Sequence, residues 1–279
     1  MTEVSVDEIL QAESELKGDS RLVILIGSLE GIKSVSKKLA ALEGVIRIRK
    51  GSYIIHGFSE IHETILESQK RVSFIKTREI PTVRTKLEEA YTERVYSIVS
   101  FSYNNPTAQQ KKYVERLLRK TTGIRLRPGV ILFPLLRSKE QRRILGSEEE
   151  RVLIDSIDFS KMVRENGGKA LRWSRLKITN CEGSSHVRHA VERTLHTDLI
   201  ALEKRIRTLR ERCKDPEVPI GKLKKNYTIL SRSFRRLKTK WMLAKKLWFY
   251  DAEKSLKRTY NMLISTRRVI ITQETTRAS

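Results

Sequence analysis

Hydrophobic positions near the start of the chain follow two alternating patterns. Short β-branched apolar runs, such as residues 22–27, are typical of buried strands, and segments with apolar residues three and four apart, such as 31–43, are typical of amphipathic helices. The predicted elements are, in order, strand 22–27, helix 31–43, strand 45–49, strand 53–56, helix 59–69 and strand 72–75. This β-α-β-β-α-β order predicts a ferredoxin-like unit over residues 21–80.

The same order of patterns appears a second time over residues 90–180. Its predicted elements are strand 94–102, helix 107–121, strand 124–127, strand 130–136, helix 147–165 and strand 170–178. A short match supports duplication, since Arg47–Gly51 (RIRKG) resembles Arg125–Gly129 (RLRPG) and each copy follows a glycine after the first helix. We therefore expect an α+β protein with two tandem ferredoxin-like βαββαβ units.

From about residue 185 the pattern becomes purely helical. Apolar residues recur three and four positions apart from Val187 to Cys213 and again from Leu223 to Trp248, a period that keeps one seam of each helix against a partner. Because the connection at 215–221 contains two prolines and a glycine, a basic antiparallel helical hairpin is predicted over 185–270. At the ends of the chain, residues 1–20 predict an acidic helix and residues 271–279 a disordered tail.

Composition adds a strong indication about the partner. The chain of 279 residues carries 57 Lys and Arg against 33 Asp and Glu, a formal charge of +24, and its pI is about 10.2. Such an excess usually has an anionic partner, most often nucleic acid, with an acidic membrane surface or an acidic protein as alternatives. Two cysteines, an acidic start and no long apolar run indicate a cytoplasmic protein that is not embedded in a membrane.

The positive charge is concentrated in the second helix of the predicted hairpin. No acidic residue occurs from 221 to 250, although solvated helices usually interleave Glu with Lys because like charges four positions apart repel. We therefore favour a phosphate-binding face over a merely solvated one, and we expect the aromatic residues of the seam to lie in the core. The candidate phosphate-binding residues are Lys222, Lys224, Lys225, Arg232, Arg235, Arg236, Lys238, Lys240, Lys245 and Lys246.

Four arginines in the predicted β-hairpins form a second candidate surface. One face of each ferredoxin-like sheet packs on helices, and we expect the other face to be free. Strand alternation places Arg47 and Arg49 on one face, with Arg125 and Arg127 equivalent in the second unit. We predict that these arginines bind phosphates bidentately. The alternative is that they are solvated or pair with one of three acidic residues, Glu30, Glu43 and Glu115.

Residues that could carry catalysis are few. Cys181, His186, His189 and His196 lie within 16 residues, but a structural zinc site needs four ligands, typically as two close pairs. We therefore favour surface histidines, with polar residues at a helix start near nucleic acid as the next alternative. The chain has no Gly-rich phosphate loop with its Lys-Ser/Thr pair, no Gly-x-Ser-x-Gly and no His-Glu-x-x-His. We predict no catalytic residue, no metal site and no cofactor.

Residues 95–178 resemble one known use of this fold. The strand Val95–Ser102 leads to a turn and the basic helix Gln109–Leu118, and Thr122–Pro134 then contains a glycine, a β-hairpin and a strand that ends at a proline. This pattern is similar to the ferredoxin-like domain shared by the small CRISPR adaptation nuclease, the phenylacetate-type repressors and the N-terminal domain of chromate-resistance regulators. The chromate-resistance regulators also continue into basic helices, as this chain does after residue 185.

The resemblance implies a DNA-associated regulator rather than a nuclease. The nuclease branch carries a metal-binding aspartate at the end of its first strand, and the matching positions here are Phe101, Ser102 and Tyr103, followed by Asn104. We therefore expect a non-enzymatic nucleic-acid-binding protein that acts in transcription regulation, with DNA favoured over RNA and with homo-oligomers allowed. The alternatives are a protein–protein scaffold built on the heptad helices and a divergent metal-dependent nuclease.

Overall fold

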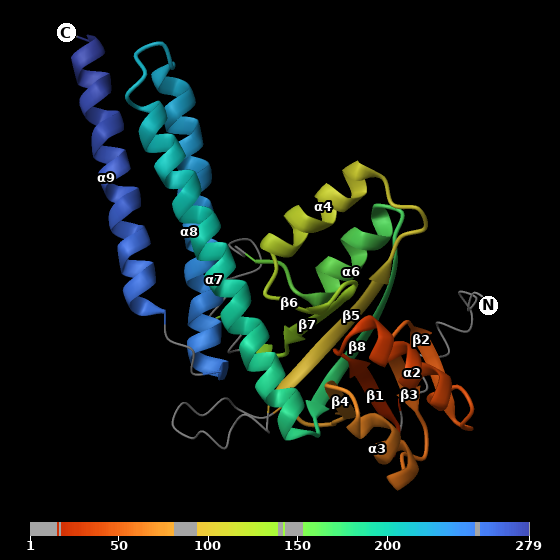
Figure 1. Ribbon diagram of the computed structural model, residues 1–279. Coiled ribbons are helices and arrows are strands. Elements are labelled where there is room, and N and C mark those ends of the chain that lie inside the picture. Colours follow the sequence, from red (N-terminus) through yellow and green to blue (C-terminus); the bar gives the residue numbers. More distant parts are fainter. Residues whose placement is uncertain are drawn as a thin grey trace. The chain divides into compact units, whose positions relative to one another are not determined.

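A computed structural model of the protein describes residues 16, 18–80, 94–138, 142, 153–248 and 252–278 (Figure 1). Within these ranges the chain is a mixed α+β protein with an eight-stranded antiparallel sheet and seven helices. It forms two compact units, Met1–Gln141 with Ile154–Ala190, and Arg142–Leu153 with Val191–Ser279. The helix expected at 1–20 lies almost wholly outside the described residues, as do the side chains of Lys246 and Trp248.

The first half of the sheet forms where the sequence predicts it. Its elements are β1 (Arg21–Leu25), α2 (Leu29–Leu39), β2 (Val45–Arg49), β3 (Ser52–Ile55), α3 (Glu60–Glu67) and β4 (Arg71–Lys76). The strands lie in the order β2-β3-β1-β4, and every neighbouring pair is antiparallel. Val23, Leu25, Tyr53 and Ile55 form one core with the apolar sides of α2 and α3, so the helices cover one face of the sheet.

The second half repeats this arrangement of elements. They are β5 (Val95–Ser102), α4 (Ala108–Arg119), β6 (Ile124–Arg127), β7 (Val130–Pro134), α6 (Ser156–Glu165) and β8 (Lys169–Ile178). The strand order is β8-β5-β7-β6, and β4 pairs with β8 to join the halves into one sheet. Helix α6 begins at Ser156 because the Asp155 carboxylate accepts hydrogen bonds from the backbone amides of Ile157 and Asp158. The rest of the helix predicted from 147 falls mainly outside the described residues.

The sheet face opposite the helices is buried, contrary to our expectation of a free face. Leu22, Ile24, Ile54 and Phe74 lie on this face and are at most 1% exposed. The start of α7 covers part of it, since a Cβ on Gly183 would lie 3.1 Å from Val72. Strands buried on both faces have continuous rather than alternating apolar runs. The continuous apolar run at residues 22–26 therefore already indicated a strand that is buried on both faces.

Three long helices follow the sheet: α7 (Cys181–Arg212), α8 (Ile220–Trp248) and α9 (Glu253–Ala278) (Figure 1). The heptad seams predicted for α7 and α8 are largely confirmed, because residues such as Leu199, Ile206, Leu230 and Leu237 are at most 5% exposed. Helix α9 packs against α8, so the predicted hairpin is in fact part of a three-helix arrangement. No helix in the described ranges combines the length and apolarity needed to cross a membrane.

The prediction of a disordered tail is wrong, because α9 continues to Ala278. The buried positions of α9, together with the residue just before it, follow the same spacing as the other seams, at Ala252, Leu256, Thr259, Leu263, Thr266 and Ile270. Two of these six residues are threonines with 0% exposure. An apolar pattern alone does not count threonine, and this is why the third seam was missed.

A buried carboxylate joins α9 to α7. Glu203 is 5% exposed, and it accepts hydrogen bonds from Thr259 Oγ1 at 2.8 Å and from Arg258 Nη2 at 2.9 Å. A carboxylate away from water is costly unless it is paired and hydrogen-bonded. This contact therefore favours one register of α9 against α7.

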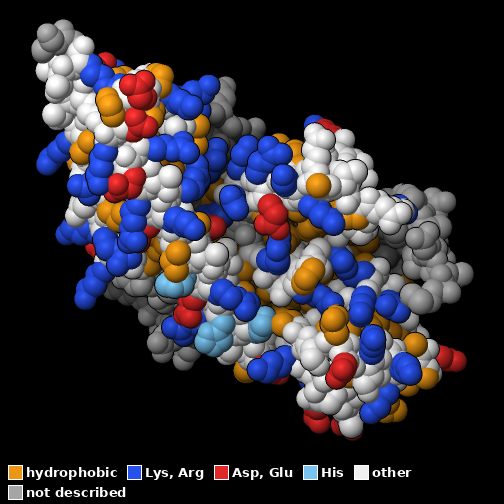
Figure 2. All heavy atoms as spheres, turned by 45° about the horizontal axis from the view of Figure 1, so that its top comes forward, with side chains coloured by type: hydrophobic (Ala, Val, Ile, Leu, Met, Phe, Trp, Pro, Cys, Tyr) orange, Lys and Arg blue, Asp and Glu red, His pale blue; other side chains and the backbone are white. Residues whose placement is uncertain are grey.

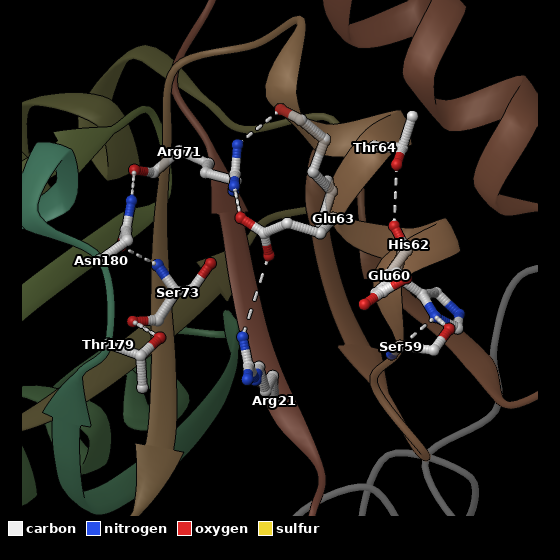
Figure 3. A network of polar contacts seen from close by, with 11 residues as sticks. Arg21, Ser59, Glu60, His62, Glu63, Thr64, Arg71, Ser73, Thr179 and Asn180 are labelled. Carbon is white, nitrogen blue, oxygen red and sulfur yellow. Dashed lines mark hydrogen bonds and ion pairs between the residues drawn. The ribbon is translucent and has the colours of Figure 1, made fainter.

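The start of α7 is fastened to the sheet by side-chain hydrogen bonds (Figure 3). The Asn180 side-chain oxygen accepts from Ser73 N at 2.9 Å, and its amide nitrogen donates to Arg71 O at 3.0 Å. Arg71 is itself buried and is paired with Glu63. Because α7 follows β8 after only two residues, these bonds fix the point at which the helical part of the chain begins.

Candidate nucleic-acid interface

Some of the cations predicted to bind phosphate pair with carboxylates of neighbouring helices instead. Lys240 is 9% exposed in its side chain and lies 3.1 Å from Asp198 of α7. Lys224 pairs with Glu274 and Lys245 with Glu253, both on α9. Inspection of α8 alone could not reveal these pairs, because every carboxylate comes from another helix. We remove these three lysines from the candidate surface.

Five predicted residues form an exposed basic face along α8. They are Lys222, Lys225, Arg232, Arg235 and Lys238, each of them exposed and none with an acidic partner among the described residues. At 1.5 Å per residue this face extends over about 24 Å. Figure 2 shows Lys and Arg side chains spread along the helical part, with fewer Asp and Glu between them. An extended row of cations of this kind matches a polyanion better than a single small anion.

Arg236 lies beside this face, and its charged form is destabilised by burial and by a neighbouring arginine. Its side chain is half-buried, and its Nε is buried without a hydrogen-bond partner in the described part of the chain. Burial, and then the neighbouring charge of Arg232, lower the pKa of Arg236. Two adjacent guanidinium groups without a carboxylate between them would be relieved by a bound anion.

A groove between α7 and α8 adds two arginines that sequence reasoning missed. It encloses about 220 Å³ and is lined by Arg205, Thr208 and Arg212 of α7 and by Asn226, Ile229 and Leu230 of α8, with Leu209 beneath. Arg205 and Arg212 are both exposed. Their separation of seven residues, which places side chains on one helix face, was the signal in the sequence that could have identified them.

A β-bulge in each hairpin changes the sheet face on which its arginines lie. The pairing register shifts between Arg47 and Arg49, and it shifts again between Arg125 and Arg127. Arg47 is therefore opposite Tyr53 on the helix-covered side, whereas Arg49 is opposite Ser52 on the other side. The prediction that both arginines share a face is wrong, because simple alternation fails at a bulge.

Arg49 and Arg127 hold the sheet together rather than displaying their charges. Each donates to two main-chain carbonyls of the other half of the sheet: Arg49 Nη1 to Phe101 and Gly129, both at 2.7 Å, and Arg127 Nη1 to Leu25 at 2.9 Å and Gly51 at 3.0 Å. Burial is the main cause that lowers the pKa of both guanidinium groups. Because Nη1 of each arginine donates within the sheet and both side chains are half-buried, neither belongs to the exposed candidate phosphate-binding residues.

The two outer hairpin arginines differ from each other. Arg125 Nη2 lies 2.7 Å from Glu115 Oε1, which is one of the alternative pairings that the sequence allowed. Arg47 is exposed and has no acidic partner among the residues that the structure describes. Of the four hairpin positions, Arg47 alone keeps an unpaired side chain in that part of the chain.

The cysteine and histidines near the start of α7 do not gather at one point. Cys181, His189 and His196 are exposed and His186 is half-buried. Within the described ranges, no group of three or more His, Cys, Asp or Glu side chains is placed to hold a metal ion. The cationic residues on α7 and α8 form an arrangement that can bind anions.

Comparison with known proteins does not connect the chain to a family. No protein-family model matches it, and neither curated proteins nor solved structures yielded a match. The interpretation of the basic helices therefore depends on their own geometry, burial and charge.

Proposed function

We propose that the protein binds nucleic acid through the exposed basic face of α8 without catalysing a reaction, and that DNA is favoured over RNA. The observation that carries this proposal is the row of five exposed cations without acidic partners among the described residues. Like charges so close together destabilise the folded state, whereas neutralising phosphates releases condensed counterions and favours binding. A role in transcription regulation is part of the proposal and rests only on the resemblance of residues 95–178 to regulator domains.

The proposal includes two tandem ferredoxin-like units as the base from which the basic helices start. The strand order β2-β3-β1-β4 and its repeat β6-β7-β5-β8 support this assignment, as does the position of the helices between the strands. Asn180 then connects the last strand to α7 and fastens the start of that helix to β4. The units thus supply a defined starting point for the helices rather than a binding face of their own.

The structure offers less support for the two alternatives. A scaffold would present its heptad seams to a partner, but Leu195, Leu202 and Leu223 of the seams are at most 4% exposed within this chain. A nuclease of the resembling kind needs an aspartate near Phe101. In this chain the Phe101 side chain packs against Phe159, with ring centroids 5.6 Å apart.

The decisive experiment reverses three charges on the exposed basic face. The variant Lys225→Glu/Arg232→Glu/Arg235→Glu should bind a fluorescent DNA duplex about 100-fold more weakly at low salt. Its plot of log K against log salt concentration should be less steep by about 3, since each phosphate contact contributes about 0.9. Fluorescence anisotropy over a salt series measures both quantities, and an RNA duplex of the same sequence tests the preference for DNA.

A matched control separates a local surface from total charge. Lys33→Glu/Lys37→Glu/Lys38→Glu changes the net charge by the same amount, at exposed positions of α2. This variant should keep nearly all of the wild-type affinity. Equal losses in the two variants, or a wild-type protein that ignores duplexes at low salt, would show that the proposal is wrong. Incubation of the same duplexes with magnesium or manganese tests the nuclease alternative, for which we expect no cleavage.

A further inference from the structure

The groove between α7 and α8 combines two kinds of surface that a phosphate-binding face alone does not need. Its rim is polar, with the guanidinium groups of Arg205 and Arg212 and the amide of Asn226. Its floor is apolar, because Leu209 and Leu230 are each 3% exposed and Ile229 beside them is 43% exposed. Ile229 thus adds exposed apolar surface to the same groove as the two arginines, and a ligand with an apolar part would gain from covering it.

A nucleic-acid duplex offers few apolar groups that could cover the apolar floor of the groove. Its bases are stacked and paired, so the surface that meets a helix consists mainly of phosphates and sugars. A single strand instead exposes flat, weakly solvated base faces, which proteins cover with apolar or aromatic side chains while cations hold the backbone. The combination of cationic rim and apolar floor therefore matches an unpaired strand.

We propose that this groove binds an unpaired nucleotide of a single-stranded nucleic acid, an inference that rests on the proposed nucleic-acid-binding function. The base covers Ile229 and Leu230, and Arg205 and Arg212 hold the backbone phosphates on either side. These arginines are seven residues apart, about 10 Å along the helix, so they reach different phosphates of the strand.

Two further features fit this ligand. The Asn226 amide has no hydrogen-bond partner within the described residues and is half-buried at the groove. It is therefore available to donate to and accept from the edge of a base. The volume of about 220 Å³ is below the range of pockets that hold drug-sized molecules, as suits one base with part of its sugar.

The test changes the groove without changing its charge. The variant Asn226→Ala/Ile229→Ala should bind single-stranded oligothymidylate about tenfold more weakly than the wild type does. It should bind a DNA duplex with the affinity of the wild type. Met242→Ala is the matched control, since Met242 is 44% exposed on the same helix and lies outside the groove lining. This control should leave both affinities unchanged. Oligouridylate tests whether the strand can also be RNA, and a tenfold loss on either strand supports the inference.

The outcomes separate this inference from the proposed function. If Asn226→Ala/Ile229→Ala weakens single strand and duplex equally, or changes neither, the groove has no preference for unpaired nucleotides and the inference is overturned, while the exposed basic face stands. Displacement by polyglutamate as effective as by unlabelled oligothymidylate would overturn it too, because the groove would then recognise charge alone. If the wild type binds no nucleic acid, both proposals fail. Circular dichroism melting verifies folding, and Asn226→Ala alone repeats the test if the double variant is unstable.

Discussion

Arg49 and Arg127 make the same contact in opposite directions across the sheet. Each guanidinium group donates to the carbonyl of the turn glycine in the other hairpin, Arg49 to Gly129 and Arg127 to Gly51. Their strands, β2 and β6, are the two edges of the eight-stranded order. In a flat sheet of eight strands these two turns would lie far apart, so the hydrogen bonds require a strongly curved sheet. The two arginines thus connect the hairpins at its two edges.

Removing either arginine should destabilise the protein. We expect Arg49→Ala and Arg127→Ala each to lower the free energy of unfolding by about 2 kcal/mol, because each variant loses two charge-assisted hydrogen bonds within the sheet. Arg47→Ala is the matched control and should cost less than about 0.5 kcal/mol, since Arg47 is exposed. Denaturant unfolding measures all three, and equal values for Arg47 and Arg49 would contradict the assigned role.

The turn glycines should be coupled to these arginines. Gly51 has φ +71°, and a Cβ there would overlap Arg127 Nη1 at 1.8 Å. Gly51→Ala therefore strains the backbone and displaces the guanidinium group, at a cost of about 2 kcal/mol. In the Arg127→Ala background only the backbone strain remains, so a double-mutant cycle should give a coupling of about 1 kcal/mol. Additive effects would show that the turn and the arginine are independent.

Glu203 should determine how firmly α9 is held. We expect Glu203→Ala to cost about 2 kcal/mol, because it removes a buried side chain and takes an acceptor from the buried hydroxyl of Thr259, whereas Arg258 stays exposed to water. Glu203→Gln keeps an oxygen for Thr259 and should cost about 1 kcal/mol. Hydrogen exchange should become faster in residues 253–278 of the alanine variant and much less so in the sheet. Uniform acceleration over the whole chain would contradict a local role.

The two thiols should differ strongly in reactivity. Cys181 is exposed and Cys213 is buried, and burial raises the pKa of the Cys213 thiol. A disulfide reagent near neutral pH should therefore modify one thiol quickly and the second only on unfolding. Because folding raises this pKa, the unfolded thiol ionises first, and Cys213 lowers the stability as the pH rises above about 8.5. Cys213→Ala should flatten that part of the pH profile, and rapid modification of both thiols would show that the helical core is open.

Two of the wrong predictions share a cause that lies outside the local sequence pattern. Alternation placed Arg47 and Arg49 on one face, but a bulge opposite Ser52 separates them. An acid-free stretch suggested ten available cations, yet Lys240 finds Asp198, 42 residues earlier in the chain. In both cases the deciding contact comes from another element, which a window along the sequence does not contain.

The sequence by itself determined most of the elements and the seams of α7 and α8, because burying apolar side chains at a period of two or 3.5 residues requires nothing beyond the local order of residues. It also determined that the chain carries a large positive charge. Only the tertiary structure decided which cations stay exposed, how the sheet curves and where a groove opens between α7 and α8. Those properties depend on distant residues that meet after folding, and their electrostatic and packing energies exist only in that arrangement.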